Sequence, residues 1–152
     1  MHIPAKVDYG VRALLTLAAR SQPTTSHELA SEQGLPTKFL AAILTELHHA
    51  GLVASQRGPE GGYYLARPAD QISMADVMRV LEGPLAEVRG LRPEMTEYGG
   101  AAAHLQQVWV AARASLRRVL ERVTLEDVVL GRLPDSVLEL IEDPDVWSAR
   151  LR

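Results

Sequence analysis

Residues 55–67, SQRGPEGGYYLAR, decide the fold, because three glycines and a proline fall within five positions between an arginine and two tyrosines. Such a segment is typical of either a phosphate-binding loop or the turn of a β-hairpin. A P-loop has a lysine and then Ser or Thr directly after its glycines, and it continues as a helix. Here YYL at positions 63–65 favours a strand, and Leu52 and Val53 lead into the turn as a first strand. The segment therefore predicts a two-stranded hairpin.

Two helices are predicted ahead of this hairpin from periodicity and capping residues. Apolar residues recur at helical spacing over residues 6–19, which predicts a first helix. Thr25 followed by Glu28 three residues later is a capping-box pattern, so a second, short helix begins there. Gly34 stands where a glycine commonly ends a helix.

A third helix is predicted over residues 37–49, and Gly51 ends it. The residues expected on its buried side are Phe39, Leu40, Ile43, Leu44 and Leu47. Three helices and a hairpin in this order predict a mainly α fold, with a winged helix-turn-helix domain over residues 1–82. In such a domain the third helix enters the major groove of DNA, and the hairpin lies along the backbone or minor groove.

Three stretches of this region resemble a known family. They are YGVRALLTLA (residues 9–18), LPTKFLAAILTELHHAGLVASQRGPEGGYYLARP (35–68) and ISMADVMRVLEG (72–83). Over residues 1–129 the chain resembles the Rrf-two (BadM) family of bacterial transcription regulators. The resemblance implies a homodimer that binds a roughly palindromic operator in double-stranded DNA, and we expect a repressor.

The net charge and the composition limit the classes of function that the chain can have. The net charge is −3, with seven Lys/Arg against eight Asp/Glu through residue 82 and nine against eleven afterwards. Because neither half is basic, a DNA footprint has to be local. The acidic balance also keeps open a protein–protein adaptor that retained the winged fold but lost DNA binding. No constellation for catalysis is visible, so an enzyme is not expected. Residues 1–10 lack a signal-peptide pattern, and we expect a cytoplasmic protein.

The expected DNA contacts lie where this fold presents residues to a duplex. Backbone amides at helix starts bind phosphates without net charge, and glycines let a wing tip approach a groove closely. Where family members commonly carry polar residues such as Glu-Gln, this chain has two alanines, which contact only thymine methyl groups. Base readout is therefore expected to be thin. The predicted DNA-binding residues are Lys6, Tyr9, Thr25, Ser26, Pro36, Thr37, Lys38, Ala41, Ala42, Arg57, Gly58, Gly61 and Gly62.

The sequence of the second half of the chain predicts a loop followed by a long helix that could form a dimer interface. Residues 83–100 contain proline, glycine and scattered charges, which indicates a loop. Residues 101–123 form one long helical pattern of about 35 Å, and a short helix capped by Thr124 completes a segment 101–130. Its apolar stripe is wide enough to form a dimer seam, although packing on the first helix is the alternative. A last helical turn or two is expected over residues 134–142, within a tail 131–152. The predicted dimer residues are Leu105, Trp109, Ala112, Leu116 and Leu120.

The region that binds an iron–sulfur cluster in some family members is where this chain differs most from the family. Cluster-binding members hold cysteines in the loop and at the start of the long helix, whereas this chain has no cysteine. An iron–sulfur cluster chiefly needs thiolates, so we predict no such cofactor. A hard-ligand metal site from Asp8, Glu94, Glu97 and His104 stays a minor alternative. The loop 83–100 is the expected receiver of a small-molecule or protein effector.

Overall fold

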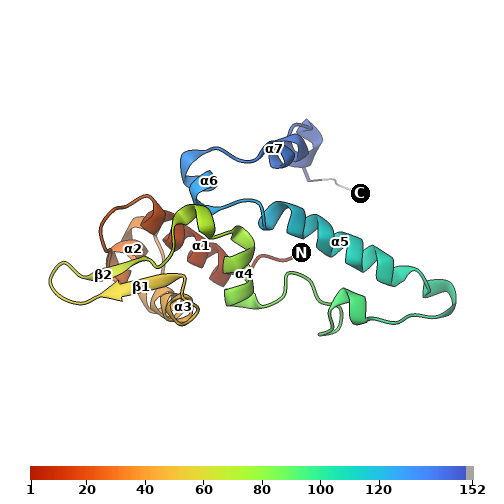
Figure 1. The fold of residues 1–152 in the computed structure, drawn as a ribbon, viewed down its shortest axis with the longest axis horizontal. Helices are drawn as coiled ribbons and strands as arrows, with labels where there is room; N and C mark the ends of the chain where they lie inside the picture. Colours follow the sequence, from red (N-terminus) through yellow and green to blue (C-terminus); the bar gives the residue numbers. More distant parts are fainter. Residues whose placement is uncertain (150–152) are drawn as a thin grey trace.

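The computed structural model describes residues 1–149, and Figure 1 shows the arrangement of their helices and hairpin. The hairpin and the far end of α5 lie at opposite ends of the long axis (Figure 1). None of the helices in residues 1–149 has the length and apolar character that a bilayer crossing requires. The elements are α1 (Ala5–Ala18), α2 (Ser26–Gln33), α3 (Thr37–His49), β1 (Val53–Gln56), β2 (Gly62–Leu65), α4 (Met74–Glu82), α5 (Leu105–Leu120), α6 (Leu125–Leu130) and α7 (Asp135–Ile141).

Capping residues set the helix boundaries as the sequence predicts. At the start of α2 the Thr25 hydroxyl accepts a bond from the Glu28 N–H at 3.2 Å, and the Glu28 carboxylate accepts the Thr25 N–H at 2.8 Å. Gly34 ends α2 with a φ of +64°, a left-handed conformation that glycine adopts without strain. Thr124 and Asp127 form the same reciprocal cap on α6.

A single apolar core joins α1, α2, α3 and α4. Leu14, Leu29 and Leu44 are fully buried in it, one from each of the first three helices. The expectation that Phe39 lies on the buried side of α3 is wrong, because its side chain is 42% exposed. The ring instead stands edge-on to Tyr9 of α1, with 5.6 Å between the ring centroids. This contact occupies the surface between α1 and the first turn of α3.

The predicted hairpin is confirmed, and its second strand is attached, close to the turn, to the loop between α1 and α2. The antiparallel pairing runs from Val53 opposite Leu65 to Gln56 opposite Gly62. Next to it, the Tyr63 N–H donates to the Thr24 carbonyl at 2.8 Å, and the Thr24 N–H donates back at 2.9 Å. These two bonds fix the wing relative to the helices of the domain.

The long helix α5 is shorter than predicted. It starts at Leu105 rather than at residue 101, because Gly100 has a φ of +59° and residues 100–102 form a 3-10 turn. None of its residues is buried. After α5 the chain returns to the winged domain, where the Leu125 N–H donates to the Ile72 carbonyl at 3.0 Å. Leu125 lies in the shared core, so α6 anchors one end of α5 while the rest projects outward (Figure 1).

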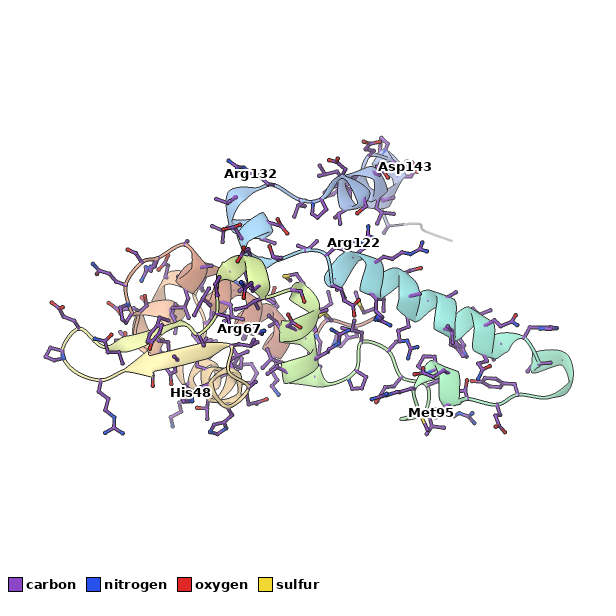
Figure 2. All side chains as sticks on the ribbon, in the orientation of Figure 1. His48, Arg67, Met95, Arg122, Arg132 and Asp143 are labelled. Atoms are coloured by element: carbon purple, nitrogen blue, oxygen red, sulfur yellow. The ribbon has the colours of Figure 1, made fainter. Side chains whose placement is uncertain are left out.

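The predicted last helical turns are confirmed as α7, and a 3-10 turn (Pro144–Trp147) follows. The predicted tail extends over residues 150–152, which lie outside the described residues. Arg122, which Figure 2 labels just beyond the end of α5, donates to the Ser136 hydroxyl of α7 at 3.4 Å. The Trp147 indole N–H donates to the Ile141 carbonyl at 2.8 Å.

Candidate nucleic-acid interface

The exposed side of α3 forms a narrow stripe. Lys38, Ala42, Thr45 and His49 are all exposed, and their spacing of four, three and four residues places them on one helix face. Thr45 and His49 were not among the predicted contacts, although this spacing is visible in the sequence. The Thr45 hydroxyl donates to the Ala41 carbonyl at 3.0 Å, which leaves its lone pairs available. Ala41 itself is only partly exposed.

The N-terminus of α3 is open to an anion. Its N-cap is Pro36, no side chain caps it, and its first turn contains no acidic residue. By contrast, α2, α4 and α6 each begin with a complete capping box. The starts of α1, α5 and α7 also have no side-chain cap, but α1 and α7 carry an acidic residue in the first turn and the first turn of α5 has no lysine or arginine. The first amides of α3 therefore have no side-chain acceptor, and Thr37 and Lys38 stand exposed beside them. Amides in this arrangement bind phosphate oxygens, and a nearby lysine strengthens the binding.

The wing carries an exposed arginine at its turn. Arg57 is exposed, and within residues 1–149 neither Arg57 nor Lys38 forms an ion pair. Gly58 has a φ of +110° with open space around it, as a turn glycine does. Gly61 and Gly62 are different, because a Cβ at either position would meet the backbone of the domain itself. Their first role is thus to let the hairpin fold and attach.

Lys6 is partly exposed, and its ammonium group is bound to other parts of its own domain. Its ammonium group lies 2.9 Å from the Glu46 carboxylate of α3 and donates to the Leu81 carbonyl of α4 at 2.9 Å. Because the Glu46 carboxylate compensates the single charge of Lys6, the pair adds no net positive charge to a DNA-facing surface. Sequence reasoning could not anticipate this pairing, because the three residues meet only in the folded chain. We therefore leave Lys6 out of the proposed DNA contacts.

The remaining candidates lie near the start of α3 or on α2. Tyr9 is partly buried and contacts Phe39, the neighbour of Lys38. The Thr25 hydroxyl is taken up by the capping box of α2, and Ser26 is partly buried behind it. The structure thus gathers Tyr9 and the residues 36–38 at one end of α3, and it presents Arg57 separately on the wing.

Comparison with known proteins identifies the family. The Rrf2 family model, described as an iron-dependent transcriptional regulator, matches residues 3–130. The chain belongs to the Rrf2 family. Among Rrf2 relatives, the HTH-type transcriptional regulator CymR of Bacillus subtilis is 34% identical over 130 residues, covering 84% of this chain and 89% of CymR. A provisionally named HTH-type transcriptional regulator of Mycobacterium tuberculosis is 48% identical over 145 residues, covering 94% of this chain and 90% of its own.

Solved structures agree with this assignment to the Rrf2 family. The structure of CymR, the global cysteine regulator of B. subtilis, matches with a TM-score of 0.73 and covers 85% of this chain and 96% of CymR. T. potens IscR matches with a TM-score of 0.70 at 29% identity and covers 97% of each chain. The winged helix-turn-helix fold is therefore confirmed, and so is the expectation of a regulator rather than an enzyme.

The residues of this Rrf2 chain do not suit a thiolate-bound iron centre. There is no cysteine in the sequence. Within residues 1–149, no three His, Asp or Glu side chains gather closely enough to hold a metal ion. Of the alternative ligand set, Asp8 pairs with Arg12 at 3.4 Å and Glu94 pairs with Arg113. The structure thus does not bring Asp8, Glu94, Glu97 and His104 together.

The predicted dimer residues of the Rrf2 chain differ in how far their own chain covers them. Trp109 and Ala112 are exposed, and Leu105 and Leu116 are partly covered. Leu120 packs against the apolar core of its own domain. Any seam with a second copy is therefore expected toward the projecting part of α5, away from Leu120.

Proposed function

We propose that this protein is a homodimeric, DNA-binding transcription regulator that acts as a repressor in the cytoplasm without an iron–sulfur cluster. Membership of the Rrf2 family supports DNA binding. The observation that carries the proposal is the uncapped start of α3, where the exposed Thr37 and Lys38 stand beside the first amides and the first turn contains no acidic residue.

In the proposed complex, α3 enters the major groove with its N-terminus toward a phosphate. Lys38 and the amides of the first turn position the helix, while the methyl group of Ala42 contacts thymine methyl groups. Arg57 on the wing reaches the backbone or the minor groove. Because few side chains read bases, the sequence-dependent shape of DNA contributes much of the specificity.

A gel-retardation assay with the DNA upstream of the protein's own gene, at two salt concentrations, tests this function. A specific complex that weakens as salt rises is expected, because binding releases counterions from the phosphates. Selection of bound genomic fragments would then define the operator. Failure to retain any DNA, from either source, would favour the alternative of a protein–protein adaptor, which the acidic charge balance suggests.

Lys38→Ala and Arg57→Ala should each weaken specific DNA binding. The expected loss is about 1–3 kcal/mol where the side chain reads a base, or a shallower salt dependence where it holds a phosphate. Arg132→Ala is the matched control, because Arg132 is an exposed cation on the connection between α6 and α7, as labelled in Figure 2. Titration of labelled DNA by fluorescence anisotropy measures the affinities. Equal affinity of all three variants, each correctly folded, would contradict the proposed surface.

The protein should purify colourless under anaerobic conditions and should bind DNA without added iron or sulfide. The physical reason is the absence of thiolate ligands, since the sequence contains no cysteine. A visible absorption spectrum and an iron assay on freshly expressed protein check this. A charge-transfer band with stoichiometric iron would disprove the cluster-free proposal and direct attention to Asp8, Glu94, Glu97 and His104 as ligands.

A further inference from the structure

A cavity of about 430 Å³ lies between α4, the loop 83–100 and α5. Its size suits a small metabolite, since ligand pockets commonly have volumes of about 300–1,000 Å³. Arginines come from three different segments of the chain to line it: one from α4, one from the loop and two from α5. The charged residues that line it are Arg79, Arg92, Glu94, Arg113 and Arg117.

The cations around this cavity outnumber the anions. Arg79 and Arg117 both bind the Glu121 carboxylate, with the Arg117 Nε at 2.9 Å. Arg113 binds the Glu94 carboxylate. Arg92 forms no ion pair within residues 1–149. Four guanidinium groups therefore face two carboxylates.

Both carboxylates are ionised, so together they offset two of the four positive charges. Hydrogen bonds from Arg79 and Arg117 lower the pKa of Glu121. A backbone hydrogen bond at Glu94, and then the bond from Arg113, lower the pKa of that carboxyl. Both groups are thus ionised at neutral pH, and two positive charges remain uncompensated. The Arg113 side chain is 20% exposed, so part of this charge lies away from bulk water.

We propose that this cavity binds a small effector molecule that carries at least two carboxylate or phosphate groups. Guanidinium groups bind both kinds of anion through paired N–H bonds, and several of them converge here. The Glu94 and Glu121 carboxylates would act as internal counterions that the effector replaces or joins. The inference rests on the proposed regulator function, because it assigns the chemistry of the effector.

The walls of the cavity explain how such an effector would regulate. Arg79 belongs to the winged domain, whereas Arg113 and Arg117 belong to α5. An anion that contacts both sides links the DNA-reading domain to the helix that we propose as the dimer seam. In a dimer this link sets the spacing of the two α3 helices, and a coupling of several-fold to about a hundredfold in DNA affinity is typical of such effectors.

Isothermal titration of the full-length protein tests the proposal with citrate and pyrophosphate as probes, against sodium chloride of equal ionic strength. We expect at least one probe to bind to the unaltered protein. The double variant Arg92→Gln/Arg117→Gln should bind it at least about tenfold more weakly, since each change removes a charge-assisted contact. Arg132→Gln removes an exposed charge that does not line the cavity, on the connection between α6 and α7 (Figure 2), and should leave the affinity unchanged. Binding of citrate alone would indicate a carboxylate effector, and binding of pyrophosphate alone a phosphate.

Three outcomes would overturn the proposal. These are that neither probe binds at millimolar concentration, that all three proteins bind with equal affinity, or that the double variant dissociates the dimer while no probe binds. In the last case the arginines would serve the interface with the second copy. DNA retardation without any anion is measured in parallel, so a failure of the effector site is distinguished from a failure of the proposed regulator function.

Discussion

Ala112→Glu should convert the protein from a dimer to a monomer and abolish binding to a two-site operator. Ala112 is exposed on α5, between the exposed Trp109 and the partly covered Leu116. If this face meets a second copy, each protomer brings one carboxylate into the seam. An unpaired buried charge costs about 3–5 kcal/mol, which a dimer of ordinary affinity cannot absorb twice. Operator binding falls with it, because two half-sites require two linked domains.

Ala114→Glu is the matched control for this substitution. Positions 112 and 114 are about 200° apart around the helix, so the same change is made on the opposite face. Ala114 is exposed, and a glutamate there stands four residues before Arg118, a favourable spacing. Ala112→Arg should dissociate the dimer as Ala112→Glu does. This second variant controls for the case in which the new glutamate forms ion pairs with arginines of the second copy, because an arginine at position 112 cannot form them. Sedimentation velocity measures the mass, and an Ala112→Glu protein that stays dimeric would place the seam elsewhere.

Ala112 is a cleaner site than the larger apolar residues of the same stripe. Leu116 is partly covered within its own chain, and Leu120 packs on the core of its own domain. A charge at either position would also destabilise the monomer. Since no residue of α5 is buried in the single chain, a glutamate at position 112 leaves folding of the monomer intact. Loss of the dimer is then attributable to the interface.

Signals that act within a few residues made much of the winged domain predictable. Thr25 and Glu28 meet within one turn of helix, and Gly34 ends α2 through its own backbone conformation. The hairpin follows from the glycines of residues 58–62 and the strand-forming residues on either side. For such elements the sequence pattern contains both partners of each interaction.

Contacts between distant segments were not predictable in the same way. Lys6 has the positive charge and the position at a helix start that are expected of a DNA contact, yet it pairs with Glu46 in the folded domain. Phe39 follows the buried periodicity of α3 but remains 42% exposed beside Tyr9. The arginine-lined cavity also depends on tertiary structure, because Arg92 and Arg113 come together only when the loop runs along α5. A helical pattern alone assigns such arginines to a solvated face.

Gly62→Ala should destabilise the winged domain and detach its wing. Gly62 has a φ of +145°, a backbone conformation that favours glycine, and a Cβ there would lie 2.5–2.8 Å from the backbone atoms of Thr24. Strain and overpacking together cost about 2–5 kcal/mol. The clash falls beside the pair of hydrogen bonds between Thr24 and Tyr63, which attach the hairpin to the α1–α2 loop. The free energy of unfolding in urea, measured by circular dichroism, should decrease accordingly.

Gly58→Ala separates this structural role of the wing glycines from a role at the DNA surface. Gly58 has a φ of +110° but no neighbouring atom within 4 Å, so an alanine there meets backbone strain of about 1–3 kcal/mol without a clash. Gly62→Ala should therefore be the more destabilising of the two. If instead Gly62→Ala unfolds like the unaltered protein and loses only DNA affinity, the glycine serves the approach to a groove rather than the attachment to Thr24. Equal destabilisation by both variants would show that the backbone conformation, and not the contact with Thr24, sets the cost.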